Sequence, residues 1–172
     1  MAPWLRLFKM AVGAPFRERL GWRDESVLTF AVWPNDLDIN LHMNNARYLA
    51  VMDIGRFDLA IRCGLARLVW RRKLKPVVAS AMVRFRRSLA PFERFTLRSR
   101  IVGWDEKWIY IDHKIERGGE LYCHAVVKAL FLAGRGSVPT RDLLDAVGAR
   151  APATELPDWL VHWQAAEAGA RG

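Results

Sequence analysis

The first third of the chain combines a short strand-like segment with one long helical pattern. Residues 26–33 (SVLTFAVW) are rich in β-branched and aromatic side chains and stop at a Pro34–Asn35 turn signal, which predicts a strand. From Asn44 onward, apolar residues recur at helical spacing until Gly64, so we expect a helix of about 18 residues with Asn44 or Asn45 as its N-cap. A shorter basic helix is expected over residues 65–73.

The second half of the chain has the pattern of four strands. After Pro76, apolar and polar residues alternate with a period of two, and similar patterns cover residues 92–104, 108–117 and 120–133. These strands predict an antiparallel meander, and short helices are expected over 140–147 and 157–168. A strand, a long helix and four strands make an α+β order, in which a curved antiparallel sheet of about five strands can wrap around one long central helix.

The N-terminal residues, about 1–20, predict an amphipathic helix. Trp4, Leu5, Phe8 and Val12 share one helical face, and the charged residues lie off it. No stretch here approaches the roughly 20 apolar residues that cross a bilayer, and we expect no secretory signal. The apolar face suits packing on the domain, which is the commoner outcome, or peripheral contact with a membrane surface.

Length and composition predict one folded domain over residues 1–172, with a core at about 26–133 and a helical tail at about 140–168. The chain has 172 residues, of which 52% are hydrophobic and 26% charged, and this balance excludes a disordered or low-complexity chain. Cys63 and Cys123 are too few for a disulfide scaffold and lack the grouping of a zinc site. We therefore expect buried thiols in a cytoplasmic protein, with membrane association left open.

The net charge of +9 favours anionic partners, which include nucleic acid, a lipid surface, a phosphate-bearing cofactor and an acidic carrier protein. Arginine supplies 21 of the 27 basic residues, so a plain compositional habit explains the charge equally well. No recognised nucleic-acid-binding motif is present, and we expect no nucleic-acid partner. The four histidines show no metal-ligand spacing, so no metal is expected.

Polar side chains that could take part in catalysis are concentrated in residues 35–48 (NDLDINLHMNNARY), at the start of the long helix. Two carboxylates, a histidine and several asparagines are more hydrogen-bonding groups than a plain connector needs. Free N–H groups at a helix start favour an oxygen that gains charge during carbonyl attack, and a neighbouring carboxylate can act as base or nucleophile. The alternative is that these residues only cap the helix and form an Asx-turn.

The segment from Asp36 to Tyr48 resembles the D-L-D-x-N-x-H-x-N-N-x-x-Y signature of acyl-carrier-protein thioesterases and the D-x-D-x-x-G-H-x-N-N-x-x-Y form of the 4-hydroxybenzoyl-CoA thioesterase type. Both are hotdog-fold enzymes. Residues 83–89 (VRFRRSL) and the 104–108 turn (WDEKW) more specifically resemble the thioesterase superfamily member six type. The resemblance covers roughly residues 26–133 and implies a hotdog fold.

Carried over by position, the resemblance makes Asp38 the catalytic carboxylate, with Asn40 and His42 also lining the active site and Asp36 in support. Asn44 and Asn45 would hold the loop and cap the helix. The acyl-carrier-protein thioesterases have a glutamate where this chain has Ser88, which departs from their pattern. The remaining candidates are assigned to substrate binding: Asn44, Asn45, Tyr48, Ser88, Arg84 and Arg86.

Arginines on two predicted strands offer a site for the substrate's phosphates. Arg84 and Arg86 share one strand face, as do Arg94, Arg98 and Arg100 on the next strand. If these faces adjoin, a basic stripe would hold the phosphates of coenzyme A or the acidic surface of a carrier protein; a solvated outer face is the equal alternative.

The function implied is hydrolysis of an acyl thioester of coenzyme A or acyl carrier protein, without any other cofactor. The alternative is a catalytically weak hotdog protein that binds acyl chains or scaffolds a partner. Hotdog proteins of this kind pair edge to edge, so the resemblance also implies a homodimer or a dimer of dimers.

Overall fold

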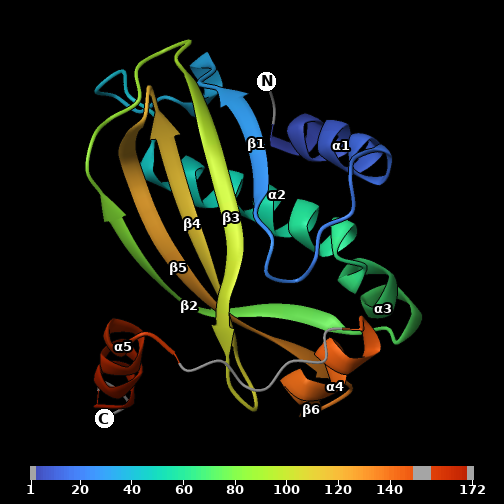
Figure 1. Ribbon diagram of the computed structural model, residues 1–172. Coiled ribbons are helices and arrows are strands. Elements are labelled where there is room, and N and C mark those ends of the chain that lie inside the picture. The colour runs from blue at the N-terminus through green and yellow to red at the C-terminus, as the bar shows by residue number, and fades with distance from the viewer. Residues whose placement is uncertain (1–2, 149–155, 170–172) are drawn as a thin grey trace.

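The computed structural model describes residues 3–148 and 156–169 (Figure 1). Its α-helices are α1 (Pro3–Gly13), α2 (Asn45–Arg62), α3 (Leu65–Arg71), α4 (Thr140–Ala146) and α5 (Asp158–Gly169), with short 3-10 turns η1 (Ala14–Phe16) and η2 (Pro34–Asp36). Its strands are β1 (Ser26–Ala31), β2 (Lys75–Phe85), β3 (Arg94–Trp104), β4 (Ile109–Arg117), β5 (Glu120–Ala133) and β6 (Gly136–Ser137). Part of the predicted C-terminal tail, residues 149–155, lies outside the described residues.

One antiparallel sheet curls around α2, as Figure 1 shows, and the predicted α+β fold is confirmed. The strand order is β1-β3-β4-β5-β2, with the two-residue β6 paired to β5. The predicted four-strand meander is wrong in one respect: β2 pairs with β5, not with β3. As a result β1 and β2 form the two edges of the main sheet, and β2 is exposed along most of its length.

The core lies between α2 and the concave face of the sheet. Toward the start of α2, Tyr48, Val51 and Met52 pack among Phe95, Leu97 and Ile115, and all six are at most 2% exposed. Gly55 lets the helix approach β3 closely, because an added Cβ would lie 2.3 Å from Ser99 Oγ and 2.7 Å from Leu97 Cδ2. The position of α2 over β3 therefore depends on the missing side chain at residue 55.

Helix α1 packs on α2 and β1, but with an unexpected face. Met10 and Ala14 enter a cluster with Ile54, and Arg6 is only 5% exposed. The apolar face of Trp4, Leu5, Phe8 and Val12, for which packing was the favoured prediction, points outward instead. Packing of the helix was correctly predicted, whereas the expected face was wrong, because a buried ion pair at Arg6 holds the opposite face against the body.

The C-terminal helix α5 lies far from α1, at the opposite end of the molecule in Figure 1. It packs through Leu160, which is fully buried with Tyr110 and Val126. Among the described residues, no helix is long and apolar enough to cross a membrane.

Candidate active site

A tight loop joins η2 to α2 and carries the predicted catalytic residues. Leu37 and Met43 form a β-bridge, and the Asp38 N–H donates to the His42 carbonyl at 2.9 Å. The Met43 N–H donates to the Leu89 carbonyl at 2.9 Å, which ties the loop to the β2–β3 connection. Leu41 has a φ of 58°, in the left-handed region where a residue with a side chain is strained. The loop is thus fixed by backbone hydrogen bonds at its base.

The two carboxylates of this loop have different environments. Asp36 is fully buried and accepts hydrogen bonds from Nη1 and Nη2 of Arg6, at 3.1 and 2.5 Å, and from the Trp33 N–H at 2.9 Å. Asp38 is half-buried, and its Oδ1 accepts the Asn40 N–H at 2.8 Å. Asp36 is therefore occupied in holding the structure together, in line with the supporting role implied for it, while Asp38 reaches solvent.

The Asp38 bond to Asn40 is the Asx-turn that the sequence offered as the alternative to catalysis. It uses one carboxylate oxygen. Within residues 3–148 and 156–169, no hydrogen-bond donor reaches Asp38 Oδ2 within hydrogen-bonding distance. An Asx-turn and a reactive carboxylate are thus compatible at this position.

The helix start has the expected cap. Asn44 is the N-cap of α2, and its side chain accepts the Ala46 N–H at 2.9 Å. Asn45 follows as the first helical residue and is exposed. The first turn of α2 contains no acidic residue, so its positive end is not neutralised from within the helix.

Tyr48 lies beneath the loop and braces it. The side chain is 2% exposed, and its hydroxyl accepts the Leu89 N–H at 3.2 Å. Burial raises the pKa of Tyr48 to about 12, so the phenol stays protonated at neutral pH. Because the Leu89 carbonyl accepts from Met43, Tyr48 connects α2 to the loop through a single intervening residue.

The remaining predicted residues surround this loop or lie on the β2 edge. Asn40, His42 and Ser88 are exposed, and Ser88 adjoins Leu89, which is bonded to the loop. The position where acyl-carrier-protein thioesterases have a glutamate is therefore beside the predicted site, but a serine hydroxyl does not act as a carboxylate base. Arg84 and Arg86 are also exposed.

The two arginine-bearing strands do not adjoin, so the condition for a basic stripe is not met. Arg84 lies on β2, whereas Arg94, Arg98 and Arg100 lie on β3, and β4 and β5 separate these two strands. Arg98 is also paired with Glu25 at 2.7 Å and with Glu116 at 3.0 Å. The stripe required a pairing of these two strands that does not occur, and within β2 a register shift between Val78 and Ser80 interrupts the predicted alternation.

A cavity of about 640 Å³ lies between the second half of α2, α3, the start of β2 and the concave face of the sheet. Its walls are mainly apolar and include Phe57, Leu59, Val69, Leu74, Ile101 and Phe131. Sequence patterns did not predict it, because a cavity arises where elements far apart in sequence fail to fill the space between them.

A polar network that runs from the exposed Asp53 to the buried His113 and Ser99 borders this cavity. Arg56 pairs with Asp53 and donates to His113 Nε2 at 3.2 Å, while His113 Nδ1 lies 2.8 Å from Ser99 Oγ. Since a guanidinium only donates, Nε2 accepts and Nδ1 carries the proton. Burial and the nearby Arg56 hold the pKa of His113 well below its ordinary value, so the imidazole is neutral at pH 7.

Comparison with known proteins now identifies the family. The family model of the thioesterase-like superfamily matches residues 32–164. The chain belongs to this superfamily. Zebrafish (Danio rerio) protein THEM6 is 34% identical over 160 residues, which cover 93% of this chain and 77% of that protein. A probable thioesterase of Saccharomyces cerevisiae is 31% identical over 119 residues, which cover 67% of this chain and 51% of its own length.

One solved structure of similar fold is a point mutant of 4-hydroxybenzoyl-CoA thioesterase in complex with 4-hydroxybenzoyl-CoA. It shares 16% identity and a TM-score of 0.63, over 70% of this chain and 96% of that one. The protein is thus a thioesterase-like hotdog protein, and the predicted resemblance is confirmed. Among the described residues, no group of three or more His, Cys, Asp or Glu side chains is arranged to hold a metal ion.

Proposed function

We propose that this protein hydrolyses acyl thioesters carried by coenzyme A or acyl carrier protein, with Asp38 as general base or nucleophile. The proposal rests on the contrast between the two loop carboxylates. Asp36 is buried in an ion pair with Arg6, whereas Asp38 faces solvent before the positive N-terminal end of α2. Asn40 and His42, on the same loop, would orient the reacting groups. The family and the CoA thioester bound to a structure of similar fold support the same chemistry.

The apolar cavity is the proposed site for the acyl group. At about 640 Å³ it falls in the range of small-molecule pockets. It lies toward the C-terminal half of α2, whereas Asp38 precedes the N-terminus of the same helix. A single protomer therefore keeps the proposed acyl pocket and the proposed catalytic loop at opposite ends of α2.

A homodimer formed through β2 would bring the two together. The β2 edge exposes Val77, Val78, Met82 and Phe85, which is unusual for a solvated edge strand. Antiparallel pairing of β2 with its copy around a two-fold axis brings the end of one β2 beside the start of the other. The loop of one protomer then lies near the cavity of its partner, so each active site would need both copies.

The dimer is tested by sedimentation velocity at micromolar concentration. We expect the wild type to sediment as a dimer or a dimer of dimers, and Met82→Asp to sediment as a monomer with lower hydrolytic activity. A variant at an exposed apolar position outside this edge, Val161→Ser, serves as the control. A monomeric wild type would refute the shared site.

Catalysis is tested with acyl-CoA thioesters of varied chain length and the Asp38→Asn variant. The asparagine side chain still accepts the Asn40 N–H, so it retains the Asx-turn and removes only the charge. Loss of a general base predicts a fall in kcat of about 10²–10⁴-fold with little change in KM. Asp145→Ala, which removes an exposed carboxylate on α4, is the matched control.

Ser88 favours a second candidate function, a catalytically weak protein that binds acyl chains or scaffolds a partner. Equal hydrolysis by wild type and Asp38→Asn, together with saturable binding of acyl-CoA, would favour this function over hydrolysis. If the missing glutamate limits the rate, Ser88→Glu should raise kcat, and it should not do so in the Asp38→Asn background.

A further inference from the structure

Helix α1 buries one charged residue among apolar ones and leaves its largest apolar side chains outside. The inward side carries Arg6, which is 5% exposed and donates to Asp36 and to the Ala31 carbonyl, the latter at 2.7 Å. Met10 packs beside it. A helix that only covers a soluble domain turns its most apolar face inward, so packing on this domain does not explain the composition of α1.

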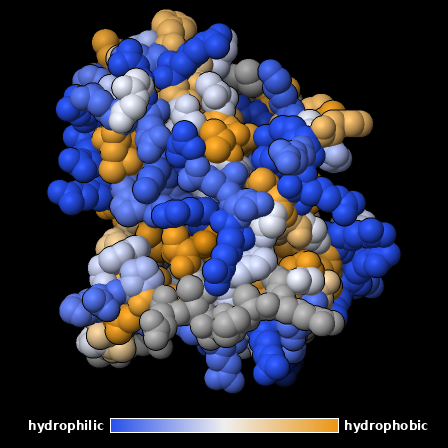
Figure 2. Space-filling model, in the orientation of Figure 1, coloured by the Kyte–Doolittle hydropathy of each residue, from blue (hydrophilic) through white to orange (hydrophobic). Residues whose placement is uncertain are grey.

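The outward side of α1 is apolar and continues into η1. Large side chains on it are exposed: Trp4 by 70%, Leu5 by 40%, Phe8 by 63%, Val12 by 53% and Phe16 by 88%. In Figure 2, apolar side chains protrude at the upper right, over the region that α1 has in Figure 1. Single exposed apolar residues are ordinary, but a group of this size on one helix face marks an interaction surface.

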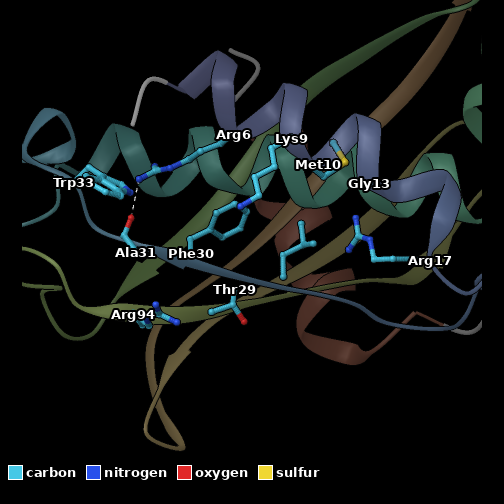
Figure 3. Close-up of a pocket in the computed structure, with 11 residues that line it drawn as sticks. Arg6, Lys9, Met10, Gly13, Arg17, Thr29, Phe30, Ala31, Trp33 and Arg94 are labelled. Carbon is cyan, nitrogen blue, oxygen red and sulfur yellow. Dashed lines mark hydrogen bonds between the residues drawn. The ribbon is translucent and has the colours of Figure 1, made fainter.

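A groove of about 400 Å³ runs between α1 and β1, next to this apolar face. Its floor includes Met10, Leu28 and Phe30, and Figure 3 shows Lys9 reaching from α1 toward it and Arg94 on the sheet side. Arg17 also lines the groove but is paired with Asp58. Neither Lys9 nor Arg94 has a salt-bridge partner in the part of the chain that the structure describes. The groove thus offers two cations without acidic partners beside an apolar surface.

We propose that the outer face of α1 and the adjoining groove bind an anionic lipid surface. The apolar side chains enter the boundary between headgroups and acyl chains, where Trp is especially favoured, and Lys9 and Arg94 contact lipid phosphates. Charge complementarity selects this occupant, because Lys9 and Arg94 line the groove without acidic partners among the described residues and the chain carries a net charge of +9. The hydrolysis of soluble thioesters does not depend on this surface, so the two proposals fail separately.

The apolar contribution is tested by cosedimentation of the full chain with vesicles of phosphatidylcholine, with or without about 30% phosphatidylglycerol. We expect the wild type to bind only the anionic vesicles. Phe8→Ser with Val12→Ser should weaken this binding at least tenfold, on the order expected from two lost apolar contacts. The control, Trp159→Ser with Val161→Ser, changes two apolar residues of α5 that are 42% and 46% exposed and should bind like the wild type.

The charge contribution is tested with Lys9→Glu and Arg94→Glu together. This pair should abolish the preference for anionic vesicles, whereas Arg135→Glu with Arg141→Glu, an identical change in net charge, should leave most of the binding intact. Raising the salt from about 0.1 M to about 0.5 M should also weaken wild-type binding. Circular dichroism establishes that each variant is folded.

Three results would overturn the proposal. The first is wild-type protein that stays in the supernatant with anionic vesicles or binds neutral vesicles equally well. The second is unchanged binding by the Phe8 and Val12 variant or by the Lys9 and Arg94 variant. The third is a drop in oligomeric mass of the Phe8 and Val12 variant in sedimentation velocity, which would identify the face as a contact between copies of this chain.

Discussion

Substituting Gly55 by alanine tests how closely α2 must approach the sheet. An added Cβ would lie 2.3 Å from Ser99 Oγ and 2.7 Å from Leu97 Cδ2, and both distances are below those of real contacts. Overpacking of a core costs about 1–3 kcal/mol, and two contacts of this kind suggest the upper end of that range. Alanine recovers about 1 kcal/mol through its higher helix propensity. We therefore expect Gly55→Ala to lower the free energy of unfolding by about 2 kcal/mol.

The assay is urea denaturation followed by tryptophan fluorescence, at one fixed protein concentration because of the proposed dimer. In thermal melts, a loss of this size corresponds to a decrease of about 4–8 °C in Tm for a chain of this length. Gly13→Ala is the matched control, since Gly13 has helical dihedral angles of −80° and −27° and nothing lies within 4 Å of an added Cβ. Its stability should be unchanged or higher by up to about 1 kcal/mol.

The double variant with Ser99→Ala locates the effect. Ser99 Oγ is the nearest atom to the added methyl, and the next serine atom, Cβ, is 3.4 Å away. Gly55→Ala should therefore cost less in the Ser99→Ala background than in the wild type, by more than the roughly 0.5 kcal/mol within which independent sites add. A Gly55→Ala protein as stable as the wild type would refute the account of this contact.

Two further predictions concern buried charged and titratable groups. Folding lowers the pKa of His113, so below the ordinary histidine pKa of 6.5 the unfolded state binds more protons than the folded state. The free energy of unfolding should therefore fall as the pH drops below 6.5, by at most about 1.4 kcal/mol per pH unit. Urea titrations at several pH values should show a shallower fall for His113→Gln than for the wild type. Arg6→Ala removes the counter-ion of the fully buried Asp36 carboxylate and should lower the free energy of unfolding by about 3–5 kcal/mol. Lys9→Ala should change it by less than about 0.5 kcal/mol. Similar losses in these two variants would contradict the assigned ion pair.

Sequence patterns predicted the positions of the helices and strands well, because caps and apolar periodicity depend only on residues close together in the chain. The N-cap at Asn44 and the glycine at position 64 bound α2, and the pattern over residues 120–133 matches β5. The strand order was not accessible in the same way. Alternation tells which residues of a strand share a face, but it carries no information about the neighbouring strand, and the residues that β2 pairs with on β5 lie about 40–60 positions later in the sequence.

The candidate site, like the fold, could be predicted where the signal is local but not where it depends on residues far apart in the sequence. Its position in the loop before α2 follows from the clustering of polar residues and from the family signature. The difference between Asp36 and Asp38 was implied only by resemblance, because the partner that buries Asp36 is Arg6, thirty residues earlier. The face of α1 was mispredicted for the same reason, since periodicity cannot identify an arginine that is held inside by a distant carboxylate.

The Arg6–Asp36 pair sets a limit on how this domain can be shortened. The core predicted from the sequence begins near residue 26, so by that prediction a truncation there leaves the stability of the domain unchanged. Such a cut would remove the only cation that bonds to the Asp36 carboxylate within residues 3–148 and 156–169. It would leave the buried Asp36 carboxylate without a counter-ion, two residues before Asp38. Among sequences related to this one, loss of the leading helix should accordingly coincide with a neutral residue at position 36.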